Sequence, residues 1–256
     1  MKILTLETST KQFSLAVSSG GKVLAHRNVR LKKVLSSSII PAIDQMLTRL
    51  KMTLKDLDGF AIGLGPGSFT SLRVGLSTVK AFALATGKPV VGIPSLDALA
   101  RNGIDQPCDQ ICTIVDARRN MVYAAVYEKK GDGLKRISDY MLTGLDKVLD
   151  KVTGKTLYVG DGVALYRGII VKKYNEAAKK HKTSCKSLFA EEKFWYPQAS
   201  ELARIAHERF ERSPERSSKD FDPIEKLVPL YLYPEDCQVN RPASGAVNKE
   251  LIRDVR

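Results

Sequence analysis

The stretch from Leu57 to Gly87 constrains the fold more than any other part of the sequence. Residues 57–65 are almost continuously apolar, which is typical of a strand covered on both faces. A Gly-Pro-Gly turn leads from it into a helix, 69–86, that is apolar on nearly every side. Such a helix directly after a buried strand predicts a layered α/β fold in which the helix lies between its own sheet and a second neighbour.

The first half of the chain predicts the order β-β-β-α-β-α-β. The expected elements are strands 2–7, 13–19 and 22–29, helix 36–51, strand 57–65, helix 69–86 and strand 89–93. The pair Gly20-Gly21 lies between two apolar runs and is a hairpin signal. Because three strands precede the first helix, we expect a mixed sheet rather than a simple alternation of strands and helices.

The same order of elements recurs in the second half, although the two halves share no evident sequence. We expect strands at 112–117, 121–131 and 134–142, a helix at 145–152 and a strand at 156–162. We therefore predict a first domain, 1–103, and a second domain, 104–236, which includes the amphipathic helix 199–212 and a return segment. A polar tail, 237–256, completes the chain.

Charge and composition narrow the class of partner. The formal net charge is +13, and the lysine-rich segment 171–193 contributes to it. This favours an anionic partner such as nucleic acid, or it reflects a basic solvated surface. No run of 18 apolar residues is present, and four cysteines and three histidines are scattered. We expect a cytoplasmic protein with reduced thiols, no membrane association and no metal site.

The turn formed by Gly63, Gly65, Pro66 and Gly67 invites comparison with phosphate-binding loops. A P-loop requires Lys followed by Ser or Thr after its last glycine, and this turn lacks that pair. A dinucleotide fingerprint is excluded as well, because its last glycine position is Ser68. Two interpretations remain: a helix N-terminus that binds an anion weakly, or a tight structural turn that needs glycine for backbone reasons.

Glu7, Thr8, Ser9 and Thr10 follow the first strand and form a second candidate site. Several phosphotransferases hold metal and phosphate with an acid at a strand end and nearby hydroxyl groups. We favour a polar turn and keep a residual nucleotide or anion site as the alternative.

Other candidate groups for catalysis are sparse. Asp116 and Asp161 are the comparable acids in the second half, and Asp116 could instead pair with an arginine or cap its turn. No Ser-His-Asp set is readable, and His207 is expected on the solvated side of its helix. We predict no catalytic residues.

Four segments resemble the TsaB family, also called YeaZ. They are the signature-like stretch 63–83, SLDALA at 95–100, DARRNMVYAAVYE at 116–128 and PLYLYPED at 229–236. The resemblance implies the two-domain fold of the actin, Hsp70 and sugar-kinase group, with RNase H-like halves. It also implies a non-catalytic subunit in the synthesis of N6-threonylcarbamoyladenosine (t6A) at position 37 of tRNAs that decode ANN codons.

The resemblance further implies the partners. TsaD would transfer threonylcarbamoyl from threonylcarbamoyl-adenylate, the ATPase TsaE would join it, and this chain could also form a homodimer. It would have no cofactor of its own, with ATP or ADP expected only in the assembled complex, and it would contact tRNA weakly or indirectly. From helical phase we map the partner interface to the following residues: Ile39, Ile43, Met46, Ser71, Arg73, Leu76, Lys80 and Leu84.

Two alternatives stay open. The first is a small ATP-dependent kinase of the same superfamily, with Glu7 holding magnesium, although family members often have Asp at this position. The second is a protease that acts on a partner. The sequence shows no recognisable pair of nucleophile and base, which argues against a protease.

Overall fold

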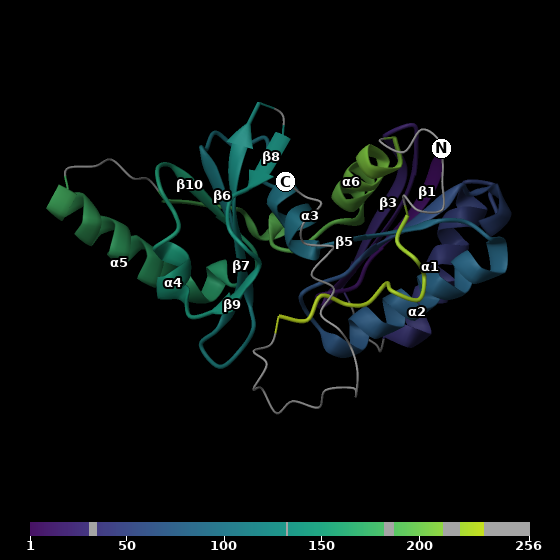
Figure 1. Cartoon of the computed structure of the whole chain (residues 1–256), viewed down its shortest axis with the longest axis horizontal. Helices are drawn as coiled ribbons and strands as arrows, with labels where there is room; N and C mark the ends of the chain where they lie inside the picture. The colour runs from purple at the N-terminus through teal and green to yellow at the C-terminus, as the bar shows by residue number, and fades with distance from the viewer. Residues whose placement is uncertain (31–34, 132, 182–186, 212–220, 233–256) are drawn as a thin grey trace. The chain divides into compact units, whose positions relative to one another are not determined.

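The computed structural model describes residues 1–30, 35–131, 133–181, 187–211 and 221–232 (Figure 1). The chain divides into two compact units. Unit 1 comprises Met1–Ala98 together with Pro197–Leu230, and unit 2 comprises Leu99–Tyr196 with the residues from Tyr231 onward. The predicted tail, 237–256, lies outside the described residues.

Unit 1 is built on a five-stranded sheet in the order β3-β2-β1-β4-β5. The strands are β1 (Lys2–Glu7), β2 (Gln12–Ser19), β3 (Lys22–Arg30), β4 (Gly59–Gly63) and β5 (Val90–Ile93). The first three are antiparallel, whereas β4 pairs in parallel with β1, and β5 in parallel with β4. The mixed sheet predicted for the first half is confirmed.

Helices cover both faces of this sheet (Figure 1). On one face, α1 (Leu35–Arg49) and α2 (Phe69–Thr86) bury their apolar sides against Leu4 and Leu6. On the other face, α6 (Ala199–Glu211) packs against Ile3. This arrangement follows from the alternation of side chains along β1, which sends successive residues to opposite faces. A short 3-10 turn, η1 (Leu54–Asp56), precedes β4, and α3 (Ser95–Arg101) follows β5.

The C-terminal helix belongs to unit 1, so the prediction that placed it in the second domain was wrong. Leu202, Ala206 and Phe210 bury the apolar side of α6 in the core of unit 1. The return segment joins the same unit, because Leu227 is fully buried there and the Leu230 N–H donates to the Leu64 carbonyl at 2.8 Å. The amphipathic pattern predicts a buried helix face but does not identify the sheet that covers it.

Unit 2 contains a six-stranded sheet in which the path β11-β10-β6-β7-β8 is joined by β9 on β7. The strands are β6 (Gln110–Asp116), β7 (Val122–Lys130), β8 (Gly133–Arg136), β9 (Met141–Thr143), β10 (Thr156–Val159) and β11 (Ser187–Phe189). Its helical segments are α4 (Leu145–Leu149), α5 (Val163–His181) and η2 (Glu192–Phe194). None of the helices within the described residues could cross a membrane.

Unit 2 departs from the sequence prediction in two places. The strand expected at 134–142 is divided into β8 and β9, because the Ser138 side chain accepts the Val126 N–H at 2.9 Å between them. The lysine-rich segment 171–193 contains the second half of α5 and then β11, a strand that the sequence pattern did not indicate and that pairs in parallel with β10.

The two units repeat one connectivity. In each, three consecutive antiparallel strands are joined by a later strand parallel to the first and by another strand parallel to that one, and unit 2 adds β9 on β7. The predicted α/β fold with two mixed sheets is therefore confirmed.

Candidate interaction site

The Gly-rich turn between β4 and α2 packs against the loop that follows β1. The Ser68 N–H donates to the Ser9 carbonyl at 2.7 Å. A Cβ added to Gly67 would collide with that carbonyl, and one added to Gly63 would collide with the Glu7 carboxylate. The glycines are therefore required by the close approach of the two loops, which supports the structural interpretation of the turn.

Glu7 joins these two loops. One carboxylate oxygen accepts the Ser9 N–H and the other accepts the Ser95 hydroxyl, both at 2.6 Å. The Ser95 oxygen in turn accepts the Gly65 N–H at 3.0 Å. Complete burial raises the pKa of Glu7, and the hydrogen bonds from Ser9 and Ser95 oppose that shift.

The predicted nucleotide or anion site is enclosed by the chain itself. Glu7, Thr8, Ser9 and Thr10 do lie together, but all four are buried. Gly75 of α2 lies so close to Thr8 that a Cβ there would collide with its side chain. Metal or phosphate at Glu7 would have to displace these contacts, so the structure favours the polar-turn interpretation.

Four of the residues assigned to the partner interface are buried inside unit 1, which leaves little of their surface for a partner. Ile39, Ile43, Met46 and Leu76 belong to the core that α1 and α2 form with the sheet. Helical spacing alone does not indicate which side of a helix meets the sheet. Buried side chains offer little surface to another molecule, although Ile39 also lines the groove described below.

The remaining four assigned residues lie at the outer side of α2 or at its edge. Lys80 is partly covered, and its pKa is lowered by burial while the nearby Glu225 of the return segment opposes that shift. Ser71 is half-buried and accepts a hydrogen bond from Ser68 at 3.1 Å. Arg73 and Leu84 are exposed.

Exposed apolar side chains do occur on this side of unit 1. Ile40 of α1 is 49% exposed, and Phe69 and Leu84 of α2 are 44% and 69% exposed. The Arg73 guanidinium lies 3.8 Å from the centre of the Phe69 ring. We call the surface made by Ile40, Phe69, Arg73, Ser77 and Leu84 the α1–α2 face.

A groove of about 370 Å³ runs between the two helices at this face. Its lining residues come from both helices: Ser36, Ile39, Ile40, Arg73, Val74, Ser77 and Thr78. Large exposed apolar side chains beside a groove are typical of a protein-interaction surface. The α1–α2 face is therefore the candidate site.

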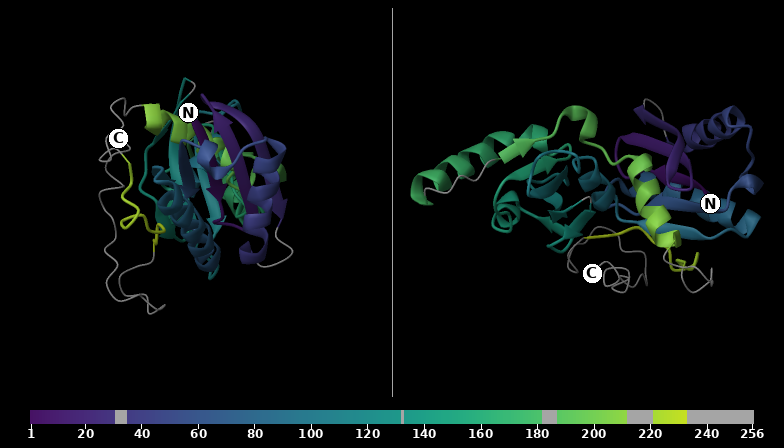
Figure 2. Two further views of the ribbon diagram at one scale, coloured as in Figure 1. Left: turned by 90° about the vertical axis from the view of Figure 1, so that its right-hand side faces the viewer. Right: turned by 90° about the horizontal axis from the view of Figure 1, so that it is seen from above.

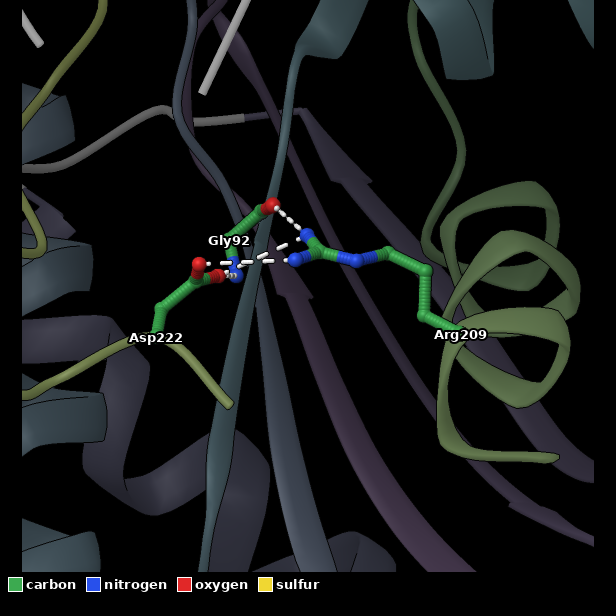
Figure 3. A network of polar contacts seen from close by, with 3 residues as sticks. All are labelled: Gly92, Arg209 and Asp222. Carbon is green, nitrogen blue, oxygen red and sulfur yellow. Dashed lines mark hydrogen bonds and ion pairs between the residues drawn. The ribbon is translucent and has the colours of Figure 1, made fainter. Parts of the chain in front are cut away.

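Two polar contacts of α6 were missed by sequence reasoning. The His207 ring nitrogen Nε2 lies 3.0 Å from the Ser18 oxygen, and both residues are buried, so the expected solvated position of His207 was wrong. Arg209 donates to the Gly92 carbonyl at 2.7 Å, and Asp222 accepts the Gly92 N–H at the same distance (Figure 3). These contacts hold α6 and the return segment against the edge of β5.

Asp116 and Asp161 of unit 2 accept hydrogen bonds from the backbone near the end of β6. Asp116 accepts the Arg118 N–H at 2.9 Å, and Asp161 accepts the Asp116 N–H at 3.1 Å. The cap interpretation of Asp116 is therefore confirmed. The three residues Arg118, Arg119 and Asn120 have positive φ angles of 63°, 52° and 59°, which the hairpin requires.

The repeated strand order defines the class of protein. Two mixed sheets that share one strand path, each with helices packed against it, make this a two-unit α/β protein. A solved structure of YeaZ from Pseudomonas aeruginosa has this fold, with a TM-score of 0.71 at 22% identity over 90% of this chain and 99% of that chain.

Sequence comparisons identify the family. Residues 30–240 match the family model described as TsaD, tRNA N6-adenosine threonylcarbamoyltransferase. The tRNA threonylcarbamoyladenosine biosynthesis protein TsaB of Bacillus subtilis is 30% identical over 173 residues, 66% of this chain and 75% of that protein. TsaB of Escherichia coli is 31% identical over 139 residues, 52% of this chain and 58% of that protein. The chain belongs to the TsaB (YeaZ) family.

Proposed function

We propose that this chain is a non-catalytic subunit in t6A synthesis that binds TsaD through the α1–α2 face. In this proposal TsaD transfers threonylcarbamoyl from threonylcarbamoyl-adenylate to N6 of adenosine 37 in ANN-decoding tRNAs. Relatives named as t6A biosynthesis proteins support the pathway, and the family model named for TsaD supports the link with the transferase.

The exposed apolar side chains of the α1–α2 face are the observation that carries the proposal. Ile40, Phe69 and Leu84 lie on two adjacent helices, and the groove between the helices suits a side chain from another helix. The same surface could join two copies of the chain, so the homodimer and the heterodimer compete for it.

The surroundings of Glu7 support the non-catalytic role. The buried carboxylate is occupied by hydrogen bonds from Ser9 and Ser95. We accordingly place catalysis and the metal in TsaD. We expect TsaE to join the complex, with ATP or ADP bound only after assembly. Because the substrate is tRNA, the proposal includes a cytoplasmic location.

Co-purification with the cognate TsaD tests the proposal. Leu84→Glu should weaken the complex at least tenfold, because a charge would replace an apolar contact in the interface. Leu84 is 69% exposed, so the variant should fold. Leu76 is unsuitable for this experiment, because it is buried and its replacement would disturb the core.

Ile137→Glu is the matched control, because Ile137 is an exposed isoleucine of unit 2. The control should bind TsaD as the wild type does, and t6A formation by the mixed proteins should follow complex formation. A wild-type chain that forms no complex with TsaD, even with TsaE and nucleotide present, would contradict the proposal.

A further inference from the structure

The positive charge of unit 2 is concentrated in one stretch. Residues 163–186, which begin with α5, contain seven lysines and arginines and one glutamate. The rest of the span from Leu99 to Tyr196 contains eleven basic and eleven acidic residues. The stretch therefore supplies the whole net charge of that span, and nearly half of the +13 of the chain.

The inner side of α5 is occupied by the core of unit 2. Ile170 is fully buried, and Tyr166 and Tyr174 pack against the same core. The Tyr174 hydroxyl lies 2.9 Å from that of Tyr158 on β10. These contacts fix the rotation of the helix about its axis, so its opposite side must face outward.

The outer side of α5 carries polar and charged side chains after Val171, as far as Glu176. Lys172, Asn175 and Glu176 are exposed, and Glu176 is the one acidic residue in the helix. The exposed Arg167 guanidinium lies 4.9 Å from the centre of the Phe189 ring. Lys173 differs from Lys172, because it pairs at 2.8 Å with Asp150, the residue that follows α4.

The helix is long enough to follow a nucleic-acid strand. Its 19 residues span roughly 28 Å at the usual helical rise. Within unit 2, α5 runs along the outside of the fold and its second half extends past the sheet (Figures 1 and 2). Exposed cations on a helix of this length, such as Arg167 and Lys172, are suited to phosphate contacts that do not depend on sequence.

The distribution of apolar residues favours RNA over a lipid surface. Leu165, Ile169 and Val171 are 62%, 51% and 36% exposed, but all three lie in the first half of α5. A helix that lies on a membrane needs an apolar side along its length. Between Lys172 and Glu176, Tyr174 packs against the core, and Lys172, Asn175 and Glu176 are exposed.

We propose that the basic outer side of α5, represented by Arg167 and Lys172, binds the phosphate backbone of the tRNA substrate. This inference rests on the proposed function for the identity of the RNA. It assigns to unit 2 a contact separate from the α1–α2 face of unit 1. The attraction is electrostatic, so it must weaken as salt is added.

Binding of an unmodified, labelled transcript of an ANN-decoding tRNA tests this inference. Fluorescence anisotropy is measured over a range of salt concentrations, with the full chain alone and with its complex with the transferase. Lys172→Glu should weaken binding about three- to tenfold and reduce the slope of log affinity against log salt by about one. Lys172→Arg should bind as the wild type does, because it keeps the charge.

Lys135→Glu is the matched control, since Lys135 is an exposed lysine of β8 at the other end of the same sheet. Equal tRNA affinity for Lys172→Glu and Lys135→Glu, in both settings, would overturn the inference. Binding of the same two variants to vesicles that contain phosphatidylserine is also measured. If Lys172→Glu weakens binding to the vesicles but not to the tRNA, the inference is overturned in favour of a lipid surface. The measurement on the chain alone decides the inference even if no complex with the transferase forms, so the two proposals can fail separately.

Discussion

A single missing side chain allows α2 to lie against the loop after β1. Gly75 is inside α2, where alanine would normally stabilise the helix by about 1 kcal/mol. A Cβ at this position would collide with the Thr8 side chain, which is buried and has little room to move. Steric contact should therefore outweigh helix propensity at this residue.

Gly75→Ala and Gly168→Ala should consequently have opposite effects on stability. We expect Gly75→Ala to lower the free energy of unfolding by about 1–3 kcal/mol. Gly168 lies in α5 with nothing within 4 Å of an added Cβ, so Gly168→Ala should raise it by roughly 0.5–1 kcal/mol. Urea unfolding measures both changes, and stabilisation by both variants would show that Thr8 does not restrict α2.

His207 should make the stability of unit 1 dependent on pH. Burial lowers its pKa below 6.5, with a smaller opposing effect from Glu211 and a small contribution from the N-terminal amine. As pH falls, the unfolded chain binds the proton first, because its histidine has the higher pKa. The stabilisation of unit 1 that comes from keeping His207 neutral is therefore complete above pH 6.5. It is lost as pH falls through the pKa of His207 in the folded protein.

Comparison of the wild type with His207→Gln isolates this effect. The wild type should lose up to about 1.4 kcal/mol of stability per pH unit more than the variant below pH 6.5. The raised pKa of Glu7 has the opposite effect on the pH dependence, because burial of its carboxyl group costs stability as pH rises above 4.5. The wild type and His207→Gln share this contribution, so it cancels in the comparison. Parallel curves of unfolding free energy against pH would mean that His207 can be protonated in the folded state without cost.

At the level of elements, the sequence predicts which segments form but not which side of each is covered. Apolar spacing and the flanking Gly87 locate α2 closely. In helices that are apolar on several sides, residue spacing does not identify the side that faces the sheet. Leu76 was therefore predicted to face a partner although it is buried. Ile40 and Phe69 were not predicted to do so although they are exposed. Only the packing of α1 and α2 on the sheet distinguishes these residues.

The contacts that fix α6 are beyond local sequence patterns for a different reason. Ser18 and His207 are 189 residues apart, and Gly92 is more than a hundred residues from both Arg209 and Asp222. No spacing rule links such positions, because they meet only when the chain returns from unit 2. The turn at Gly63–Gly67 was predicted only in part. Its glycines indicate that the backbone needs them, but the sequence does not show that Ser9 is the residue they contact.

At the level of the whole molecule, unit 1 is completed by residues that follow unit 2 in the chain. Leu202, Ala206 and Phe210 cover the face of the sheet that includes Ile3 and Val91. Each large apolar side chain buried in this way contributes about 1.5–3 kcal/mol. Loss of α6 should therefore remove several kcal/mol from a domain whose total stability is typically about 5–15 kcal/mol.

A chain that ends at residue 196 should accordingly fail to form a stable unit 1. We expect it to bind the hydrophobic dye ANS and to lose a cooperative melting transition, because the face around Ile3 is left bare. A chain that ends at residue 232 retains α6 and the return segment and is the control, and a peptide of residues 197–232 added to the shorter chain should restore part of the transition. If the chain of 196 residues melts as the control does, the strands and helices before residue 99 would be sufficient for unit 1, and α6 would be an attachment to a domain already complete.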